Sequence, residues 1–152
     1  MPEGAKTVAR NRRAFHEYAI EEKFECGIEL VGSEVKSIRA GNMAFGDSYG
    51  RIRDGQLWLV GFRISPYDQA SIFNHEPDRE RRLLMHKDEV RRMRRRVEER
   101  GYTLIPLQIY IKRGLVKVEL GIGKGKKQYD KRQAIKQRDQ GREAEREARD
   151  RY

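Results

Sequence analysis

The sequence has few of the residues that build disulfides, metal sites and membrane spans. Its 152 residues include one cysteine and three histidines, so an internal disulfide is excluded and a cysteine-based zinc site would lack ligands. No apolar run approaches the ~20 residues that cross a bilayer, and the polar N-terminus lacks the apolar centre of a secretory signal. These absences predict a soluble protein of the cytoplasm that does not contact membranes.

Motifs of catalysis and cofactor binding are also scarce. Gly121, Gly123 and Gly125 precede two lysines, but a phosphate-binding loop needs a different glycine spacing and a Ser or Thr after its lysine. We expect the string GKGKK at 123–127 to be a flexible backbone that carries ammonium groups towards phosphates. No histidine has a second ligand at helical spacing. The sequence therefore predicts no catalytic residue, no metal ligand and no cofactor.

Positive charge is abundant and unevenly distributed. Lys and Arg outnumber Asp and Glu by 34 to 24, which gives a net charge of +10. Residues 1–78 are slightly acidic, so the whole excess lies in 79–152, in two blocks separated by the more apolar stretch 101–122. Focused positive potential attracts polyanions by displacing their counterions. The pattern favours nucleic-acid binding, although a pair of solvated helix faces would also produce it.

The middle of the sequence is typical of short antiparallel strands. Asp54-Gly55 separates two strand-like runs within 48–60, and this dipeptide favours a tight hairpin turn. Residues 116–122 alternate between apolar and polar, the period of a half-buried strand, and they follow a nearly continuous apolar run over 104–111. Pro106 cannot donate to a sheet ladder, so it marks a strand start, a bulge or an edge.

Two helices are expected between the strands. Ser33 is suited to cap a helix over 34–40, in which Glu34 faces the positive end of the helix dipole. A second helix, around 87–100, has an apolar face made of Val90, Met93 and Val97. Its opposite face is almost solid arginine, which either contacts a polyanion or faces water.

Short strands and few helices in a small chain predict a mainly β fold. A small closed barrel would remove exposed sheet edges, and a two-layer α+β sheet is the competing architecture. Among the aromatic residues, Trp58 falls in an apolar segment and is expected in the core. Four tyrosines near turns or basic residues are candidates for stacking on bases, namely Tyr18, Tyr49, Tyr67 and Tyr129.

The chain changes character after Lys127. From 128 to 152 the only large apolar side chains are Tyr129, Ile135 and Tyr152, too few to offset the entropy lost on ordering. This basic tail is therefore expected to be disordered alone. It is also rich in helix formers with ion-pair spacing, which favours folding against a partner. A solubilising tail without a partner is the alternative.

Several strings taken together resemble the small protein B (SmpB) family of tmRNA-binding proteins. They cover nearly everything from Asn11 to Arg138 in the family's order: NRRAFHEYAIEEKFECGIEL, GSEVKSIRAG, DSYGRI, ISPY, NHEPDRERRLLMHKDEV, GYTLIPLQIYIKRGLVKVELGIGKGKK and YDKRQAIKQRD. The resemblance implies a closed six-stranded antiparallel barrel, related to oligonucleotide-binding (OB) barrels, with a few helices packed on it. Residues 1–128 would form this tmRNA-binding domain, with 1–10 flexible, and 129–152 the tail.

The resemblance also implies a function in trans-translation. Members of the family bind the tRNA-like domain of tmRNA (SsrA RNA), promote its charging with alanine, and travel with it to stalled ribosomes. The implied partners are tmRNA, the ribosome at its small-subunit RNA, decoding centre and message channel, and, through tmRNA, elongation factor Tu and alanyl-tRNA synthetase. The tail would become helical in the empty message channel. A monomer without catalytic activity is expected.

Residue roles follow where the motifs match. The resemblance assigns tmRNA binding to Asn11, Arg13, Glu25, Lys36, Arg39, Lys124, Lys126 and Lys127. It assigns ribosome binding to the tail residues Tyr129, Asp130, Lys131, Arg132, Ile135 and Lys136. Glu25 cannot attract phosphates, so it would accept hydrogen bonds from base or ribose donors, or orient a nearby arginine.

Three positions depart from the family pattern. Phe15 and Asn42 stand where the family commonly has basic residues, and Gly123 where it often has alanine, which leaves the details of the N-terminal RNA contact open. Two other functions stay possible from the sequence. A structural ribosomal protein would share the basic extension, and an RNA-modifying enzyme could assemble its site from distant residues.

Overall fold

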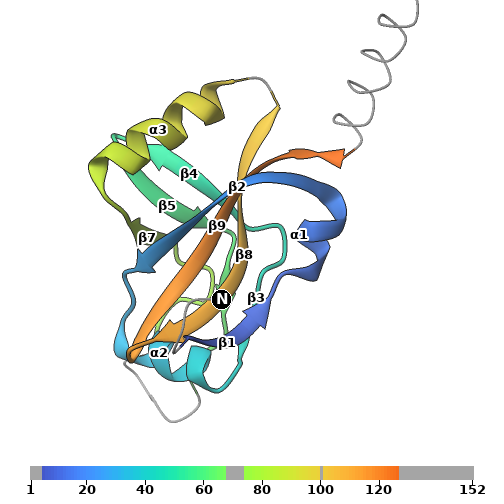
Figure 1. The fold of residues 1–152 in the computed structure, drawn as a ribbon. Coiled ribbons are helices and arrows are strands. Elements are labelled where there is room, and N and C mark those ends of the chain that lie inside the picture. Colours follow the sequence, from blue (N-terminus) through green and yellow to red (C-terminus); the bar gives the residue numbers. More distant parts are fainter. Residues whose placement is uncertain (1–4, 68–73, 100, 127–152) are drawn as a thin grey trace, which may run out of the picture.

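The computed structural model describes residues 5–67, 74–99 and 101–126. Lys127 and the tail at 129–152, with its six predicted ribosome-binding residues, lie outside this part of the chain. Strands dominate the described residues (Figure 1). In chain order the elements are β1 Ala5–Arg10, α1 Arg12–Glu17, β2 Tyr18–Ile28, α2 Gly32–Arg39, β3 Met43–Ala44, β4 Tyr49–Arg53, β5 Gln56–Val60, β6 Arg63–Ile64, β7 Arg81–Leu84, α3 Lys87–Glu98, β8 Tyr102–Lys112 and β9 Leu115–Gly125.

The main sheet has seven antiparallel strands in the order β1-β8-β4-β5-β7-β2-β9, and β8 also pairs with β9. The strand pairs differ in length. β9 pairs with β8 and β2 along nearly its whole length, whereas β4 meets β8 at the single pair Gly50–Leu104. The predicted mainly β fold with few helices is confirmed. The sheet is not a clean barrel, so a regular closed cylinder is not confirmed.

Both tight turns use left-handed backbone. Asp54 and Gly55 have φ values of 53° and 73° between β4 and β5, and Arg113 and Gly114 have 53° and 77° between β8 and β9. Two consecutive positive φ values match the right-handed twist of the flanking strands, so the hairpin predicted at Asp54-Gly55 is confirmed. Pro106 coincides with a shift in the β8–β9 register, which is the bulge that its missing N–H favours.

The core lies between the strands and under α3. Along β9, Val116, Val118, Leu120 and Ile122 are all buried, as the alternation predicts. From α3, Val90 and Met93 are buried and Val97 packs against the same cluster, which confirms the predicted apolar face of that helix.

Four expectations from the sequence are corrected. Residues 5–10, expected within a flexible start, form β1 along β8. The string at 123–127 was expected to be flexible, but its residues up to Gly125 belong to strand β9. Trp58 is only half-buried and points away from the core, since it alternates with the buried Leu57 and Leu59.

The fourth correction concerns the start of α2. Ser33 lies inside the helix, and its hydroxyl shares a hydrogen bond with His75 Nδ1 at 2.8 Å. Glu34 caps the helix instead, because its carboxylate accepts the Val31 backbone N–H at 2.9 Å. A glutamate in the first turn can reach back to the N-cap amide. The Ser33 hydroxyl does not cap the helix, because it is hydrogen-bonded to His75 instead.

Glu34 also anchors a buried ion pair. It is fully buried, as is Arg81 of β7, whose Nε donates to its carboxylate. Arg79 Nη2 donates to the same carboxylate at 2.5 Å. Arg81 further donates to three backbone carbonyls, at Phe62, Glu76 and Pro77, over 2.6–3.3 Å. One side chain thereby ties β7 to α2 and to the connection between β5 and β7.

Replacing Glu34 with glutamine should leave the Arg81 charge buried without its counter-charge. Removing one partner of a buried pair costs about 3–5 kcal/mol, so we expect the free energy of unfolding, measured by urea denaturation at pH 7, to fall by that amount. The control is Glu80→Gln, because the Arg53–Glu80 pair is partly exposed at 3.5 Å and should be worth below ~1 kcal/mol. Equal losses in the two variants would contradict the role given to Glu34.

The same pair predicts a pH dependence. Burial alone would raise the pKa of Glu34, but the hydrogen bonds from Arg79, Val31 and Arg81 outweigh it and hold the pKa below its ordinary value. A carboxyl with a lowered pKa stabilises the fold above its unfolded pKa, and this contribution is lost as the pH falls through the folded pKa. The gap between the native chain and Glu34→Gln should therefore close in acid.

Candidate nucleic-acid interface

Asn11 fixes the position of α1 on the sheet. Its side chain accepts the Ala14 backbone N–H at 3.2 Å and donates to the Pro106 carbonyl at 2.8 Å, while its own N–H donates to the Leu107 carbonyl at 2.8 Å. Asparagine is among the best N-cap residues, and here it also satisfies a carbonyl at the β8 bulge. Asn11 is only 8% exposed, so the structure makes it a residue that positions α1.

α1 packs on β8 through a small apolar contact, and two glycines of β9 lie close to the neighbouring strands. Ala14 packs against Ile105 and Leu107 in a small cluster separate from the main core. A Cβ at Gly121 would lie 2.8 Å from Leu107 Cδ1, and one at Gly123 would lie 2.7 Å from the Ala19 carbonyl oxygen. Packing therefore explains the glycines at 121 and 123, the second of which stands where the family often has alanine, whereas a Cβ at Gly125 would meet nothing within 4 Å.

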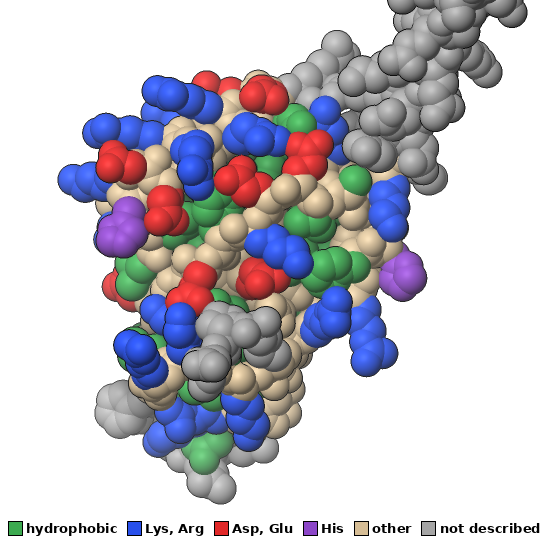
Figure 2. All heavy atoms as spheres, viewed as in Figure 1, with side chains coloured by type: hydrophobic (Ala, Val, Ile, Leu, Met, Phe, Trp, Pro, Cys, Tyr) green, Lys and Arg blue, Asp and Glu red, His purple; other side chains and the backbone are tan. Residues whose placement is uncertain are grey.

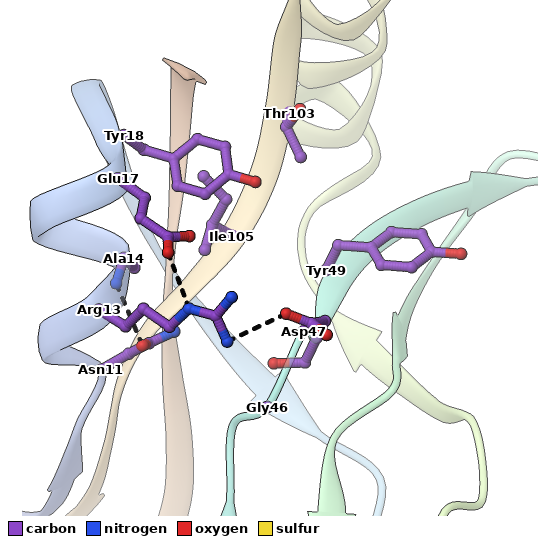
Figure 3. Close-up of a pocket in the computed structure, with 11 residues that line it drawn as sticks. Asn11, Arg13, Ala14, Glu17, Tyr18, Gly46, Asp47, Tyr49, Thr103 and Ile105 are labelled. Atoms are coloured by element: carbon purple, nitrogen blue, oxygen red, sulfur yellow. Dashed lines mark hydrogen bonds and ion pairs between the residues drawn. The ribbon is translucent and has the colours of Figure 1, made fainter. Parts of the chain in front are cut away.

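A small pocket separates α1 from the segment before β4 (Figure 3). It has a volume of about 160 Å³ and its rim includes Arg13, whose guanidinium bridges Glu17 at 2.9 Å and Asp47 at 3.1 Å. Ser48 also lines the pocket, and its hydroxyl oxygen is buried with no hydrogen-bond partner among the described residues. Tyr49, which is 40% exposed, completes the rim. The pocket thus has a cation and an aromatic ring at its exposed rim and a buried hydroxyl among its lining residues.

Glu25 is held by neighbours on β8. Its carboxylate accepts a hydrogen bond from the Tyr110 hydroxyl, and Lys112 Nζ lies 3.4 Å from both carboxylate oxygens. The bond from Tyr110 lowers the pKa of Glu25, burial opposes it, and Lys112 adds to the lowering. Glu25 is thus an ionised, oriented acceptor on the outer face of the sheet.

The lysines at the end of β9 diverge. Lys124 lies over the Tyr102 ring, with its Nζ 4.3 Å from the ring centroid. Lys126 is exposed and lines a pocket with His16, Glu17 and Tyr18 at the end of α1. The structure therefore brings Lys126 towards α1, while Lys124 lies beside Tyr102.

The basic residues of α2 lie elsewhere. Lys36 is exposed, with its Nζ 5.6 Å from the Tyr67 ring centroid. Arg39 Nη2 donates to the Gly114 carbonyl at 3.3 Å, at the turn between β8 and β9. Figure 2 shows Lys and Arg side chains gathered at this end of the molecule and again over α3, where acidic side chains lie among them. The predicted residues therefore occupy separate regions rather than one compact site.

Sequence reasoning missed three contributors, namely Ser48, Tyr110 and Lys112. Tyr110 is buried, and its hydroxyl reaches Glu25. β2 and β8 do not pair directly and are joined through β9, so no sequence spacing links these residues. Phe15, one of the departures from the family pattern, lies under Arg10 and Lys23 at 4.8 and 5.6 Å from its ring centroid, so positive charge is still present there.

The described ranges contain neither a metal-binding cluster nor a membrane-spanning helix. Within residues 5–67, 74–99 and 101–126, no three His, Cys, Asp or Glu side chains are grouped so as to hold a metal ion. No helix in this part of the chain has the length and apolar character to span a membrane.

Comparison with known proteins gives the family. The model of the family described as "SmpB protein" matches residues 8–150, and the chain belongs to this family. A relative from Treponema denticola, named SsrA-binding protein, is 51% identical over 142 residues, which is 93% of this chain and 92% of the relative. Another of the same name, from Carboxydothermus hydrogenoformans, is 52% identical over 147 residues, or 97% and 99% of the two chains.

A solved structure is also similar. It is described as "tmRNA-SmpB: a journey to the center of the bacterial ribosome", and the similarity has a TM-score of 0.66 at 49% sequence identity. It covers 77% of this chain and 82% of the other. The likeness therefore extends to the arrangement of the strands and helices.

Replacing Tyr110 with phenylalanine should raise the pKa of Glu25 towards its ordinary value, because the hydrogen bond that most favours the charged carboxylate is removed. The measurement is an NMR titration of the Glu25 side-chain carboxyl carbon. Tyr102→Phe is the control, since Tyr102 contacts Arg96 and Lys124 rather than Glu25. An unchanged pKa in Tyr110→Phe would mean that Lys112 alone sets it.

Proposed function

We propose that this protein binds tmRNA and takes part in trans-translation as a non-catalytic RNA-binding factor of the cytoplasm. The observation that carries the proposal is identity of about half of all residues to SsrA-binding proteins along nearly the full length. The similarity to the structure described with tmRNA and the ribosome supports it, as does the net charge of +10.

The proposed tmRNA contact is centred on α1 and the adjoining outer face of the sheet. Arg13 supplies a cation at the pocket rim, Lys126 a second one at the end of α1, and Glu25 an oriented acceptor for base or ribose donors. Asn11 acts by positioning α1. Folded RNA hides most base edges, so such a surface would recognise shape, ribose and phosphate. The proposal extends to Lys36, Arg39, Lys124 and Lys127, whose basic side chains would meet phosphates.

We further propose that the tail acts on the ribosome. The residues assigned to it by family resemblance are Tyr129, Asp130, Lys131, Arg132, Ile135 and Lys136, which would bind small-subunit RNA at the decoding centre and in the empty message channel. Promotion of alanine charging, delivery with elongation factor Tu, contact with alanyl-tRNA synthetase through tmRNA, and a monomeric state belong to the same proposal.

The finer architecture is also a proposal. β8, β4, β5, β7, β2 and β9 pair in a ring that returns to β8, which supports a closed six-stranded OB-like barrel. Its weak point would be the Gly50–Leu104 pair, where a Cβ on residue 50 would lie 2.8 Å from Leu104 Cβ. Only glycine lets the two backbones approach so closely.

The direct test of the function is binding to transcribed tmRNA by fluorescence anisotropy, with a tRNA of another amino acid as competitor. We expect tmRNA to bind specifically in the presence of excess tRNA. Equal affinity for both RNAs would contradict the proposed function.

Replacing Lys124, Lys126 and Lys127 together with glutamine should weaken tmRNA binding and reduce its salt dependence. Each phosphate contact contributes roughly 0.7–0.9 to the slope of log K against log salt, so the loss of three should lower the slope by about 2–3. The matched control is the variant in which the same three lysines are changed to arginine, because it keeps the positive charges and should keep the salt slope. An unchanged slope in the glutamine variant would mean that these lysines do not meet phosphates.

Deleting residues 129–152 should leave tmRNA affinity nearly intact and abolish peptide tagging on stalled ribosomes, because the two activities use different parts of the chain. Anisotropy measures the first, and a reconstituted translation assay on a message without a stop codon measures the second. A truncated chain that loses tmRNA affinity as completely as tagging would contradict the division into two binding parts.

A further inference from the structure

The pocket between α1 and the segment before β4 has the size of a single ring. Its volume is about 160 Å³, and an apolar protein cavity of roughly 150 Å³ holds one benzene molecule. Sites for drug-sized ligands are larger, from about 300 Å³ upwards. The pocket is therefore suited to one six-membered ring and is too small for a whole nucleotide or a segment of peptide.

The inner part of the pocket is apolar. Ala14 of α1 and Ile105 of β8 line it, and both are buried. Tyr18 packs against the same small cluster, and Figure 3 shows its ring pointing from the start of β2 towards the β4 side of the pocket. The Tyr49 ring points away from the pocket in this view. A flat ring bound here would cover the apolar surface of Ala14, Ile105 and Tyr18.

A hydroxyl in the pocket lining lacks a partner. Ser48 is 6% exposed, and its Oγ is buried without a hydrogen bond to any described residue. The serine is fixed in place, because its N–H donates to the Phe45 carbonyl at 3.0 Å and a Cβ on Gly61 would lie 3.4 Å from its Cα. A buried polar group that makes no hydrogen bond is costly. A ligand in the pocket would give this hydroxyl, which can both donate and accept, the partner it lacks.

The rim of the pocket carries charge of both signs. Arg13 lies between Glu17 and Asp47, at 2.9 and 3.1 Å, and all three side chains are more than half exposed, so these pairs are weak. The rim therefore offers both donors and acceptors to the edge of a ring. A guanidinium in weak pairs can also turn to a phosphate that follows the ring.

We propose that this pocket binds one unpaired pyrimidine base of tmRNA. Proteins read RNA sequence mainly at unpaired bases that are splayed out of loops and bulges. A pyrimidine is one planar ring with donors and acceptors on its edge, so its face would lie on the apolar surface and its edge would reach Ser48. A purine, with two fused rings, exceeds the space. The inference rests on the proposed function in taking tmRNA as the partner, and it adds a base-specific contact to a surface that otherwise recognises shape, ribose and phosphate.

Chemical modification of tmRNA in complex with the full chain tests the proposal. A carbodiimide modifies unpaired uracil and guanine, and dimethyl sulfate modifies unpaired cytosine and adenine, so the two reagents together report on every base. We expect the native chain to protect one unpaired pyrimidine that stays reactive with Ser48→Ala. The affinity of Ser48→Ala for tmRNA, measured by fluorescence anisotropy, should fall by roughly 2- to 12-fold, the effect of losing one neutral hydrogen bond.

The matched control is Ser37→Ala. Ser37 is also buried, but its hydroxyl donates to the Ser65 carbonyl at 2.7 Å. Loss of that bond should lower the urea midpoint and leave the protected pyrimidine and the tmRNA affinity unchanged. In Ser48→Ala the midpoint should stay the same or rise, because no hydrogen bond within the fold is lost. The two buried serines thus separate stability from base binding.

A second arm of the experiment uses no RNA. Uridine and adenosine are added separately to the full chain, and NMR follows the backbone amides of Thr103 and Ile105, which line the pocket. Uridine should shift both amides in a saturable manner, and adenosine should bind more weakly because its base is too large. Ser48→Ala should weaken uridine binding by the same roughly 2- to 12-fold.

Three results would overturn the proposal. The first is a tmRNA complex in which no pyrimidine is protected, which would leave a polypeptide side chain as the occupant. The second is a pyrimidine protected equally by Ser48→Ala and the native chain at equal affinity, which would mean that only water binds this hydroxyl. The third is adenosine that binds as tightly as uridine. Failure of the native chain to bind tmRNA would contradict the proposed function instead, and the nucleoside arm would then decide on the pocket by itself.

Discussion

The buried pair between Glu34 and Arg81 is the interaction on which the rest of the structure depends. Burying two opposite charges is costly unless each finds further partners, and here the carboxylate also accepts from Arg79 and Val31 while the guanidinium reaches three carbonyls. The pair therefore fixes one end of α2, the start of β7 and the connection before it. It places Glu34 of the string GSEVKSIRAG and Arg81 of the string NHEPDRERRLLMHKDEV in the interior, where they act on folding, while Lys36 stays exposed.

A second constraint acts on the outside of the sheet. Gly121 and Gly123 have no side chains to collide with Leu107 of β8 and Ala19 of β2, and Leu107 is the residue on which Ala14 of α1 packs. The string expected to be a flexible carrier of lysines thus has a second role: Gly123 allows close approach of the Ala19 backbone on β2, while Lys124 and Lys126 lie in different places. The candidate interface depends on both.

The distribution of charge explains why net charge alone is a poor guide to a binding surface. α3 carries five arginines between 91 and 96, but two of them bind glutamates of β2 and lie over aromatic rings. The acidic excess of the first half of the chain is used in this way, to hold the basic second half in place. What remains available is a smaller set of exposed cations, which includes Lys126 at the end of α1 and Arg51, Arg82 and Lys87 on the other side of the molecule.

The sequence by itself determined the class of fold and the family. Period-two alternation in 116–122 and the Asp54-Gly55 turn gave strands and a hairpin, because both depend on neighbours along the chain. The partners of Glu25, the burial of Arg81 and the outward position of Trp58 could not be predicted, because each depends on which strands pair and in what register. Ser33 was misassigned for the same reason: its partner, His75, lies 42 residues away. Turns and strand patterns depend on residues that are close in the sequence, so they can be predicted from it. The functional surface forms only when β2, β8 and β9 lie side by side in the sheet.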